Sequence, residues 1–298
     1  MTRGASQHPA GTRGAKAPRS TTALVLTAMF RNRLAIFGAI VVAVVICVAL
    51  LAPMIMPFDP DRPSLANRLA PPSSENWFGT DHYGRDVLSR TIWGARTSLL
   101  VAVTSVLVGT SVGLLLGLVA GFFGGGLDSV IMRTMDVLLA FPLLLLALAL
   151  ISVFGSSLAN VILATGIATI PRFARVVRGS VLSVKERDYI QATRALGSGS
   201  GRMMFLHVLP NALAPLIVMA TLYSATVIIL EANLGFLGFG VQPPEASWGS
   251  IVNDGRRYLR EGPWVSIFPS VAIVVTVVGI NLFGDGLRDA MDPHVRNR

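Results

Sequence analysis

The residue types that most often carry catalysis or hold metal ions are few in this sequence and stand far apart. Four histidines fall in four different predicted loops: His8, His82, His207 and His294. The only cysteine, Cys47, lies inside an apolar run, and neither a His-x-x-x-His spacing nor a cysteine pair occurs. The usual ligand sets for zinc are therefore missing. His82 is close to Asp81 and Asp86, but we expect a solvated loop there. We therefore expect the protein to hold neither a metal nor a cofactor.

The phosphate-binding loop of many ATPases is also excluded. That loop needs Gly-Lys followed by Ser or Thr, whereas the only lysines, Lys16 and Lys185, follow alanine and valine. The glycine-rich stretch 197–201 has no lysine and no preceding strand, so we interpret it as a flexible turn. No nucleophile is paired with a base either, and we expect a protein that is not itself an enzyme.

The composition indicates the class of protein and the kind of element that builds it. Of 298 residues, 52% are hydrophobic and 14% are charged, against about 25% charged residues in a typical soluble protein. Six runs contain no Asp, Glu, Lys or Arg: Leu34–Met56, Ser98–Gly121, Val137–Phe154, Leu158–Pro171, Ala212–Leu230 and Trp264–Gly284. Most have the length of about 17–25 residues that crosses a bilayer. This segregation of charge predicts an all-α integral membrane protein with six transmembrane helices.

The distribution of basic residues predicts the orientation. With residues 1–33 in the cytoplasm, the inner segments carry 17 Lys and Arg and the outer loops carry 8, so the positive-inside rule places both termini in the cytoplasm. The same rule explains the net charge of +9. Since no basic face alternates with aromatic residues, we expect no nucleic-acid partner. The short run Leu158–Pro171 spans only if its helix continues past Arg172 and Arg175, with those side chains snorkelling to the interface.

The chain is expected to divide into four parts. Residues 1–23 form a disordered cytoplasmic tail. Residues 24–97 hold a lead-in, the first span and an outer segment, in which Gly84 to Trp93 could form a helix on the membrane surface. Residues 98–286 form a five-helix core that includes a cytoplasmic loop at 185–210, and residues 287–298 form a second cytoplasmic tail.

A glycine stripe marks the second span. Glycine recurs at every fourth position: Gly109, Gly113, Gly117 and Gly121. Such a stripe lets another backbone approach closely, so we expect this helix in the protein interior, packed within one subunit rather than between subunits. Prolines at 142, 215 and 269 predict kinks in other spans.

The segment 172–211 is long for a connection, and its pattern indicates folded structure. Residues 185–196 have helical spacing, and Gly197 follows where a helix end favours a positive φ. Met203 to His207 suggest a second short helix, ended by Leu209-Pro210. Two short helices joined by a glycine turn predict a docking element, with packing onto the chain's own spans as the alternative.

Several stretches match a known family. Gln191-Ala-Thr193, followed by Gly197 and Leu209-Pro210, resembles the "EAA" loop of bacterial ABC-importer permeases. Further stretches are similar to the dipeptide/oligopeptide/nickel branch, and to its second permease subunit: residues 78–90, 187–197, 234–244 and 284–293. The resemblance covers roughly residues 24–295 and implies the type I ABC importer permease fold.

The resemblance implies that this loop couples the chain to an ATPase. The coupling residues would be Asp188, Tyr189, Gln191, Ala192, Thr193, Ala195, Leu196, Gly197, Leu209 and Pro210. The family's glutamate is Gln191 here, and its third-position alanine is Thr193. An ion pair from that glutamate to the ATPase would therefore be absent.

The resemblance also implies partners and a mechanism. A second, homologous permease subunit would complete the pathway across the lipid bilayer of the bacterial inner membrane. Cytoplasmic ATP-binding subunits would hydrolyse ATP, and an extracytoplasmic substrate-binding protein would deliver peptides or similar small solutes. A metal chelate or glutathione is the alternative cargo. Outside this family, a secondary transporter, a membrane enzyme and a sensor or anchor subunit remain as rivals. The first is disfavoured because no run contains a carboxylate or a histidine and no inverted repeat is seen.

Overall fold

The computed structural model describes residues 32–291. The predicted tail 1–23, the lead-in 24–31 and residues 292–298 of the predicted C-terminal tail lie outside this range. The described part is helical, with no strand beyond an isolated bridge between Thr80 and Asp86.

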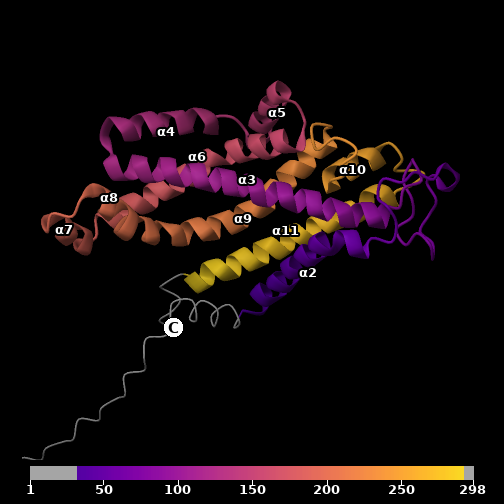
Figure 1. The fold of residues 1–298 in the computed structure, drawn as a ribbon, viewed down its shortest axis with the longest axis horizontal. Coiled ribbons are helices and arrows are strands. Elements are labelled where there is room, and N and C mark those ends of the chain that lie inside the picture. The colour runs from indigo at the N-terminus through magenta and orange to yellow at the C-terminus, as the bar shows by residue number, and fades with distance from the viewer. Residues whose placement is uncertain (1–31, 292–298) are drawn as a thin grey trace, which may run out of the picture.

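Five described helices are long and apolar enough to cross a membrane: α2 (Arg33–Ile55), α3 (Val87–Phe123), α6 (Leu158–Lys185), α9 (Leu209–Phe236) and α11 (Trp264–Met291). A sixth crossing is available if α4 (Gly125–Leu139) and α5 (Leu143–Phe154) count together. The short elements are η1 (Leu65–Asn67), α7 (Asp188–Ala195), α8 (Ser200–Arg202), η2 (Met203–Val208) and α10 (Trp248–Arg256). Figure 1 shows α7 and α8 at one end of the long axis, and α10 with the segment 57–86 at the other.

The third span is not the single helix predicted for Val137–Phe154. α4 and α5 meet at an angle of 92° across a break at residues 140–142. Pro142 takes an extended conformation, with φ −54° and ψ 136°, because proline has no N–H to donate and disfavours helix in the residue before it. The expected kink is therefore a sharp break, and α4 lies along α3 and α6 (Figure 1).

The second span begins earlier than predicted. The separate surface helix expected from Gly84 to Trp93 does not exist, because α3 runs without a break from Val87 to Phe123. Asp86 caps it, its carboxylate accepting a hydrogen bond from the Ser89 N–H at 2.7 Å. Arg90 and Arg96 consequently lie on the first turns of a membrane-crossing helix.

α6 continues past Arg172 and Arg175, as its crossing requires. Both arginines are exposed, and each has a polar partner. Arg175 donates to Asp136 of α4 at 2.6 Å, and Arg172 donates to the hydroxyl of Tyr223 on α9. A third arginine, Arg178, binds Asp128 through two hydrogen bonds of 2.5 and 2.7 Å. This bidentate geometry is the stronger form of the pair and fixes α4 against α6.

The glycine stripe of α3 faces α6 of the same chain. A Cβ on Gly113 would lie 2.5 Å from Cβ of Phe173, and one on Gly121 would lie 2.9 Å from Cβ of Val181. Each step of four residues along α3 is matched by four along α6, where the backbone oxygens of residues 166, 170, 174 and 178 face the stripe. The two helices are therefore parallel and nearly in backbone contact over three turns.

We expect Gly113→Leu or Gly117→Leu to reduce the yield and the melting temperature of the folded chain in detergent. A leucine side chain must displace the backbone of α6, and overpacking of this kind costs about 1–3 kcal/mol or more. The matched control is Gly179→Leu on α6, where an added Cβ meets no atom within 4 Å. Equal melting temperatures for Gly113→Leu and Gly179→Leu would show that the α3–α6 contact is not required.

Candidate functional site

Residues 186–208, which follow α6 and include α7, α8 and η2, lie at one end of the molecule and are called the α7 unit below. α7 begins with Asp188 and ends with Arg194 in its last turn, so both charges complement the helix dipole. Gly197 follows with φ +81°, and its N–H donates to the Arg194 oxygen at 3.0 Å. The Ser198 N–H reaches back to the Thr193 oxygen at 3.3 Å. This is the glycine-ended turn expected from the sequence.

Most of the predicted coupling residues are exposed in this unit. Asp188, Tyr189, Gln191, Ala192, Ala195, Leu196 and Gly197 are exposed on α7 and its end, and Thr193 is half-buried. Ile190 anchors the helix, being only 1% exposed, whereas Leu196 is 89% exposed. On the next segment Phe205 and Leu206 are also exposed. Large apolar side chains are thus left uncovered at the end of the molecule where charged residues are common.

Leu209 and Pro210 do not end a second short helix, so that prediction is wrong. α8, the π-helical segment η2 and α9 form one continuous helix from Ser200 to Phe236. Pro210 stands in the first turn of α9, where Leu209 is half-buried and Pro210 is exposed. Proline is accommodated there because the widened π-helical turn precedes it and proline needs no N–H partner.

Lys185 connects this unit to α3. Its ammonium group donates to the carbonyl oxygens of Gly121 and Phe122 at 3.1 and 2.7 Å. These carbonyls belong to the last turn of α3, where a helix lacks internal donors and favours a cation. The residue immediately before the α7 unit is therefore held by the helix that carries the glycine stripe.

A groove runs along four of the spans. Its volume is about 920 Å³, and residues of α2, α3, α9 and α11 line it. On α3 the lining extends from Arg96 to Leu114, a length of about 27 Å at 1.5 Å per residue. The walls are mostly apolar, with hydroxyl groups of Thr110, Ser224 and Thr276 among them.

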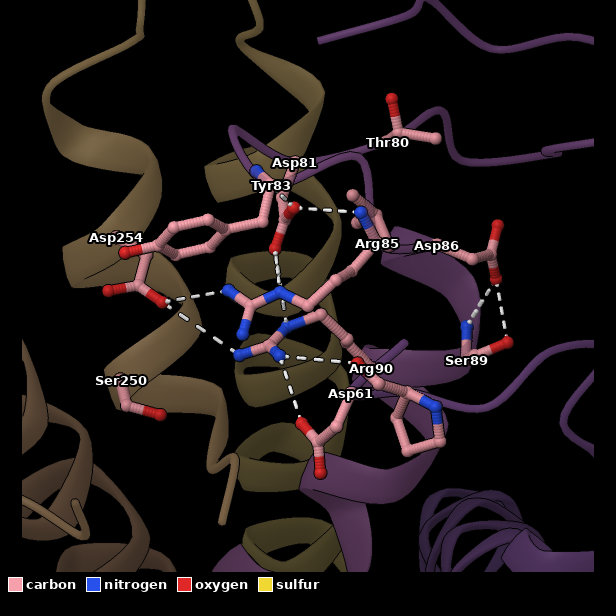
Figure 2. Close-up of polar contacts among 12 residues, drawn as sticks. Asp61, Thr80, Asp81, Tyr83, Arg85, Asp86, Ser89, Arg90, Ser250 and Asp254 are labelled. Carbon is pink, nitrogen blue, oxygen red and sulfur yellow. Dashed lines mark hydrogen bonds and ion pairs between the residues drawn. The ribbon is translucent and has the colours of Figure 1, made fainter. Parts of the chain in front are cut away.

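The opposite end of the molecule holds a polar cluster that the sequence analysis missed (Figure 2). Arg85 donates to Asp81 at 2.7 Å, and Arg90 lies 3.4 Å from Asp61. Asp254 of α10 lies 3.7 Å from Arg85 and 3.8 Å from Arg90. Burial raises the pKa of the Asp254 carboxyl, an effect opposed chiefly by Arg90. The cluster joins the segment 57–86, the start of α3 and α10.

The expected solvated loop around His82 is also wrong. Asp81 and Asp86 are both buried. Asp81 accepts from the N–H groups of Tyr83 and Arg85 at 2.8 and 2.9 Å, and Asp86 accepts from the Asn76 amide at 2.9 Å. Burial lowers the pKa of His82, against the opposing effect of Asp81. The one available signal was the density of Asp, Gly and Arg in residues 79–90, which favours side-chain-capped turns.

A second missed residue is Glu231. The span predicted for Ala212–Leu230 extends to Phe236 in α9, so it does contain a carboxyl group. Glu231 is completely buried and accepts a hydrogen bond from Ser98 of α3 at 3.1 Å. The Ser98 oxygen in turn accepts from the Trp248 N–H of α10 at 3.2 Å. This chain of hydrogen bonds joins α9, α3 and α10 near the polar cluster.

Comparison with known proteins matches most of the chain. Residues 113–297 match the family described as binding-protein-dependent transport system inner membrane component. Residues 20–72 match the N-terminal transmembrane domain of oligopeptide transport permease C. The first match covers more than half of the chain and includes the α7 unit.

Three relatives agree with this family. The chain is 43% identical over 267 residues to the dipeptide transport system permease protein DppC of Alkalihalophilus pseudofirmus, covering 90% of this chain and 88% of the relative. It is 43% identical to the di/tripeptide transport system permease protein DppC of Pseudomonas aeruginosa, covering 89% of this chain and 90% of the relative. It is 42% identical to the glutathione transport system permease protein GsiD of Pectobacterium atrosepticum, covering 90% of this chain and 89% of the relative.

A solved structure shares the fold. A chain of the MetNI methionine ABC transporter, in an inward facing conformation, superposes with a TM-score of 0.56 at 22% sequence identity. The match covers 68% of this chain and 96% of that chain. The predicted all-α membrane architecture of a type I ABC importer permease is confirmed. The chain belongs to the family of binding-protein-dependent transport system inner membrane components, as a multi-pass permease subunit.

Proposed function

We propose that this chain forms one half of the pathway of an ATP-driven importer for small peptides. The observation that carries the proposal is the groove, which extends along four spans and is not enclosed by this chain alone. A second, homologous permease subunit facing it would close the pathway. The peptide cargo rests on the relatives at 43% identity, whose names specify dipeptide and di/tripeptide transport.

The α7 unit is the docking site for a cytoplasmic ATP-binding subunit in this proposal. Its support is the exposed apolar set of Tyr189, Leu196, Phe205 and Leu206. A free protein surface rarely leaves such side chains uncovered together. A hollow of about 520 Å³ beside α7, lined by Lys185, Glu186, Gln191 and Arg194 among others, provides a polar rim. Because Gln191 is neutral, the contact would rely on packing and hydrogen bonds rather than on an ion pair at that position.

The α10 end would face the extracytoplasmic binding protein. The positive-inside rule assigns the α7 end to the cytoplasm, which leaves the polar cluster and α10 on the outer face. Arg85, Arg90 and Asp254 hold α10 against the start of α3. A displacement of α10 would therefore move α3. Because Lys185 binds the last turn of α3, the displacement would also reach the α7 unit.

A second candidate cargo is glutathione or another small solute such as a metal chelate. One relative at 42% identity is named for glutathione transport. The uptake experiment decides between these cargoes: the chain, its partner permease, the ATP-binding subunits and the binding protein are reconstituted in proteoliposomes. We expect ATP-dependent uptake of a labelled dipeptide. Uptake of glutathione with none of dipeptides would replace the peptide assignment.

We expect Gly197→Val to leave the chain in the membrane but to reduce co-purification of the ATP-binding subunits and uptake. Valine at φ +81° is strained by about 1–2 kcal/mol, so the turn after α7 must change shape. Gly199→Val is the matched control, since Gly199 has φ −63° and no atom within 4 Å of an added Cβ. Wild-type uptake by Gly197→Val would mean that the α7 unit does not couple transport to ATP hydrolysis.

The orientation predicts a labelling pattern for single cysteines in a Cys47→Ser background. Ser74 and Glu245 are exposed at the α10 end. Cysteines at these two positions should therefore react with an impermeant thiol reagent added outside. Ser200→Cys, exposed at the α7 end, should react only after the membrane is permeabilised. Reaction of Ser200→Cys in intact cells would reverse the assignment of the two ends.

A further inference from the structure

The groove has a single charged side chain among its lining residues, and it lies at the α10 end. Arg96 is the first α3 residue of the lining, and the remaining walls offer only apolar groups and hydroxyls. Leu100, Val103, Leu107 and Leu114 follow it on the same face of α3. Their spacing of three, four or seven residues places Arg96 in line with the groove rather than beside it.

Arg96 differs from Arg85 and Arg90, and it is the arginine that lines the groove. Arg85 and Arg90 are engaged by Asp81, Asp61 and Asp254. Within residues 32–291, no carboxylate lies within 4 Å of Arg96, and its guanidinium makes no hydrogen bond. It lies over the ring of Trp93, with 5.5 Å between the guanidinium carbon and the ring centroid. Stacking on an aromatic face orients a guanidinium and leaves its N–H groups free for an anion.

We propose that Arg96 receives the free carboxylate of the transported peptide at the outer mouth of the groove. The assignment rests on the proposed function, and it adds the specificity-determining residue for an anionic group. A guanidinium binds a carboxylate with two parallel, charge-assisted hydrogen bonds. Without such a partner, a carboxylate entering walls as apolar as these would lose its hydration with no compensation.

The position of Arg96 also allows release. Below the mouth, the groove contains only uncharged hydroxyls such as those of Thr110, Ser224 and Thr276. Conduction needs a site that is attractive enough to enter and weak enough to leave. One cation at the entrance with no second cation beneath it meets both needs, because nothing further along the groove holds the carboxylate.

The test compares uptake of a dipeptide with a free carboxylate and of the same dipeptide as its C-terminal amide. Both are supplied at concentrations that saturate the binding protein, to the full complex in proteoliposomes. We expect Arg96→Gln to lower uptake of the free acid about tenfold, as for loss of one charged hydrogen-bonded pair. Uptake of the amide should not change, and Arg96→Lys should retain part of the free-acid uptake. Arg260→Gln, an exposed outer arginine outside the groove, is the control.

A chemical rescue tests the charge itself. In a Cys47→Ser background, Arg96→Cys is modified with one of two methanethiosulfonate reagents. One adds a positively charged aminoethyl group, and the other adds a negatively charged sulfonatoethyl group. The aminoethyl group should restore free-acid uptake, and the sulfonate should not. If both reagents act alike, or if Arg96→Gln lowers acid and amide uptake equally, Arg96 has a structural role or contacts the partner permease. If Arg96→Gln has no effect on either peptide, Arg96 does not bind the carboxylate and the proposal is overturned. Absence of peptide uptake by the wild-type complex would instead overturn the proposed function.

Discussion

The close approach of α3 and α6 is the contact on which the rest of the structure depends. Glycines at every fourth position of α3 let the backbone of α6 lie against it, and the offset between the helices stays constant over three turns. In a membrane, where lipid provides no hydrophobic drive for helix association, such close packing is a principal source of stability. A shift of either helix by one residue would place side chains against backbone, so the contact also fixes the register.

That fixed pair links the two ends of the molecule. The first turns of α3 carry Arg90 of the polar cluster, and its last turn is bound by Lys185 at the end of α6. α6 leads directly into the α7 unit, and Trp248 of α10 donates its indole N–H to the Thr91 oxygen of α3 at 2.9 Å. A continuous set of packed helices thus connects the two ends, as the proposed coupling to an ATP-binding subunit requires.

Several polar groups of residues 32–291 are positioned by partners within the chain. Arg175 and Arg178 pair with α4, Glu231 accepts from Ser98, and Asp81 is enclosed by donors from its own turn. Each of these groups would be costly to leave unpaired in a membrane-spanning protein. Arg96 contrasts with them, since it lies at the mouth of the groove with an aromatic ring as its neighbour.

Features that depend on local pattern were determined by the sequence itself. Charge-free runs identified the spans, the four-residue period of glycine indicated the packed face of α3, and Gly197 has the positive φ expected of a helix end. Tertiary structure decided what depends on distant partners. The Arg178–Asp128 pair joins residues 50 apart, and Ser98 meets Glu231 across 133 residues. Likewise, Pro142 predicted a bend, but not that α4 would lie against α6, where Arg175–Asp136 and Arg178–Asp128 pair. A sequence pattern reports which face or turn a residue favours, whereas burial and ion pairing depend on which segment arrives opposite it.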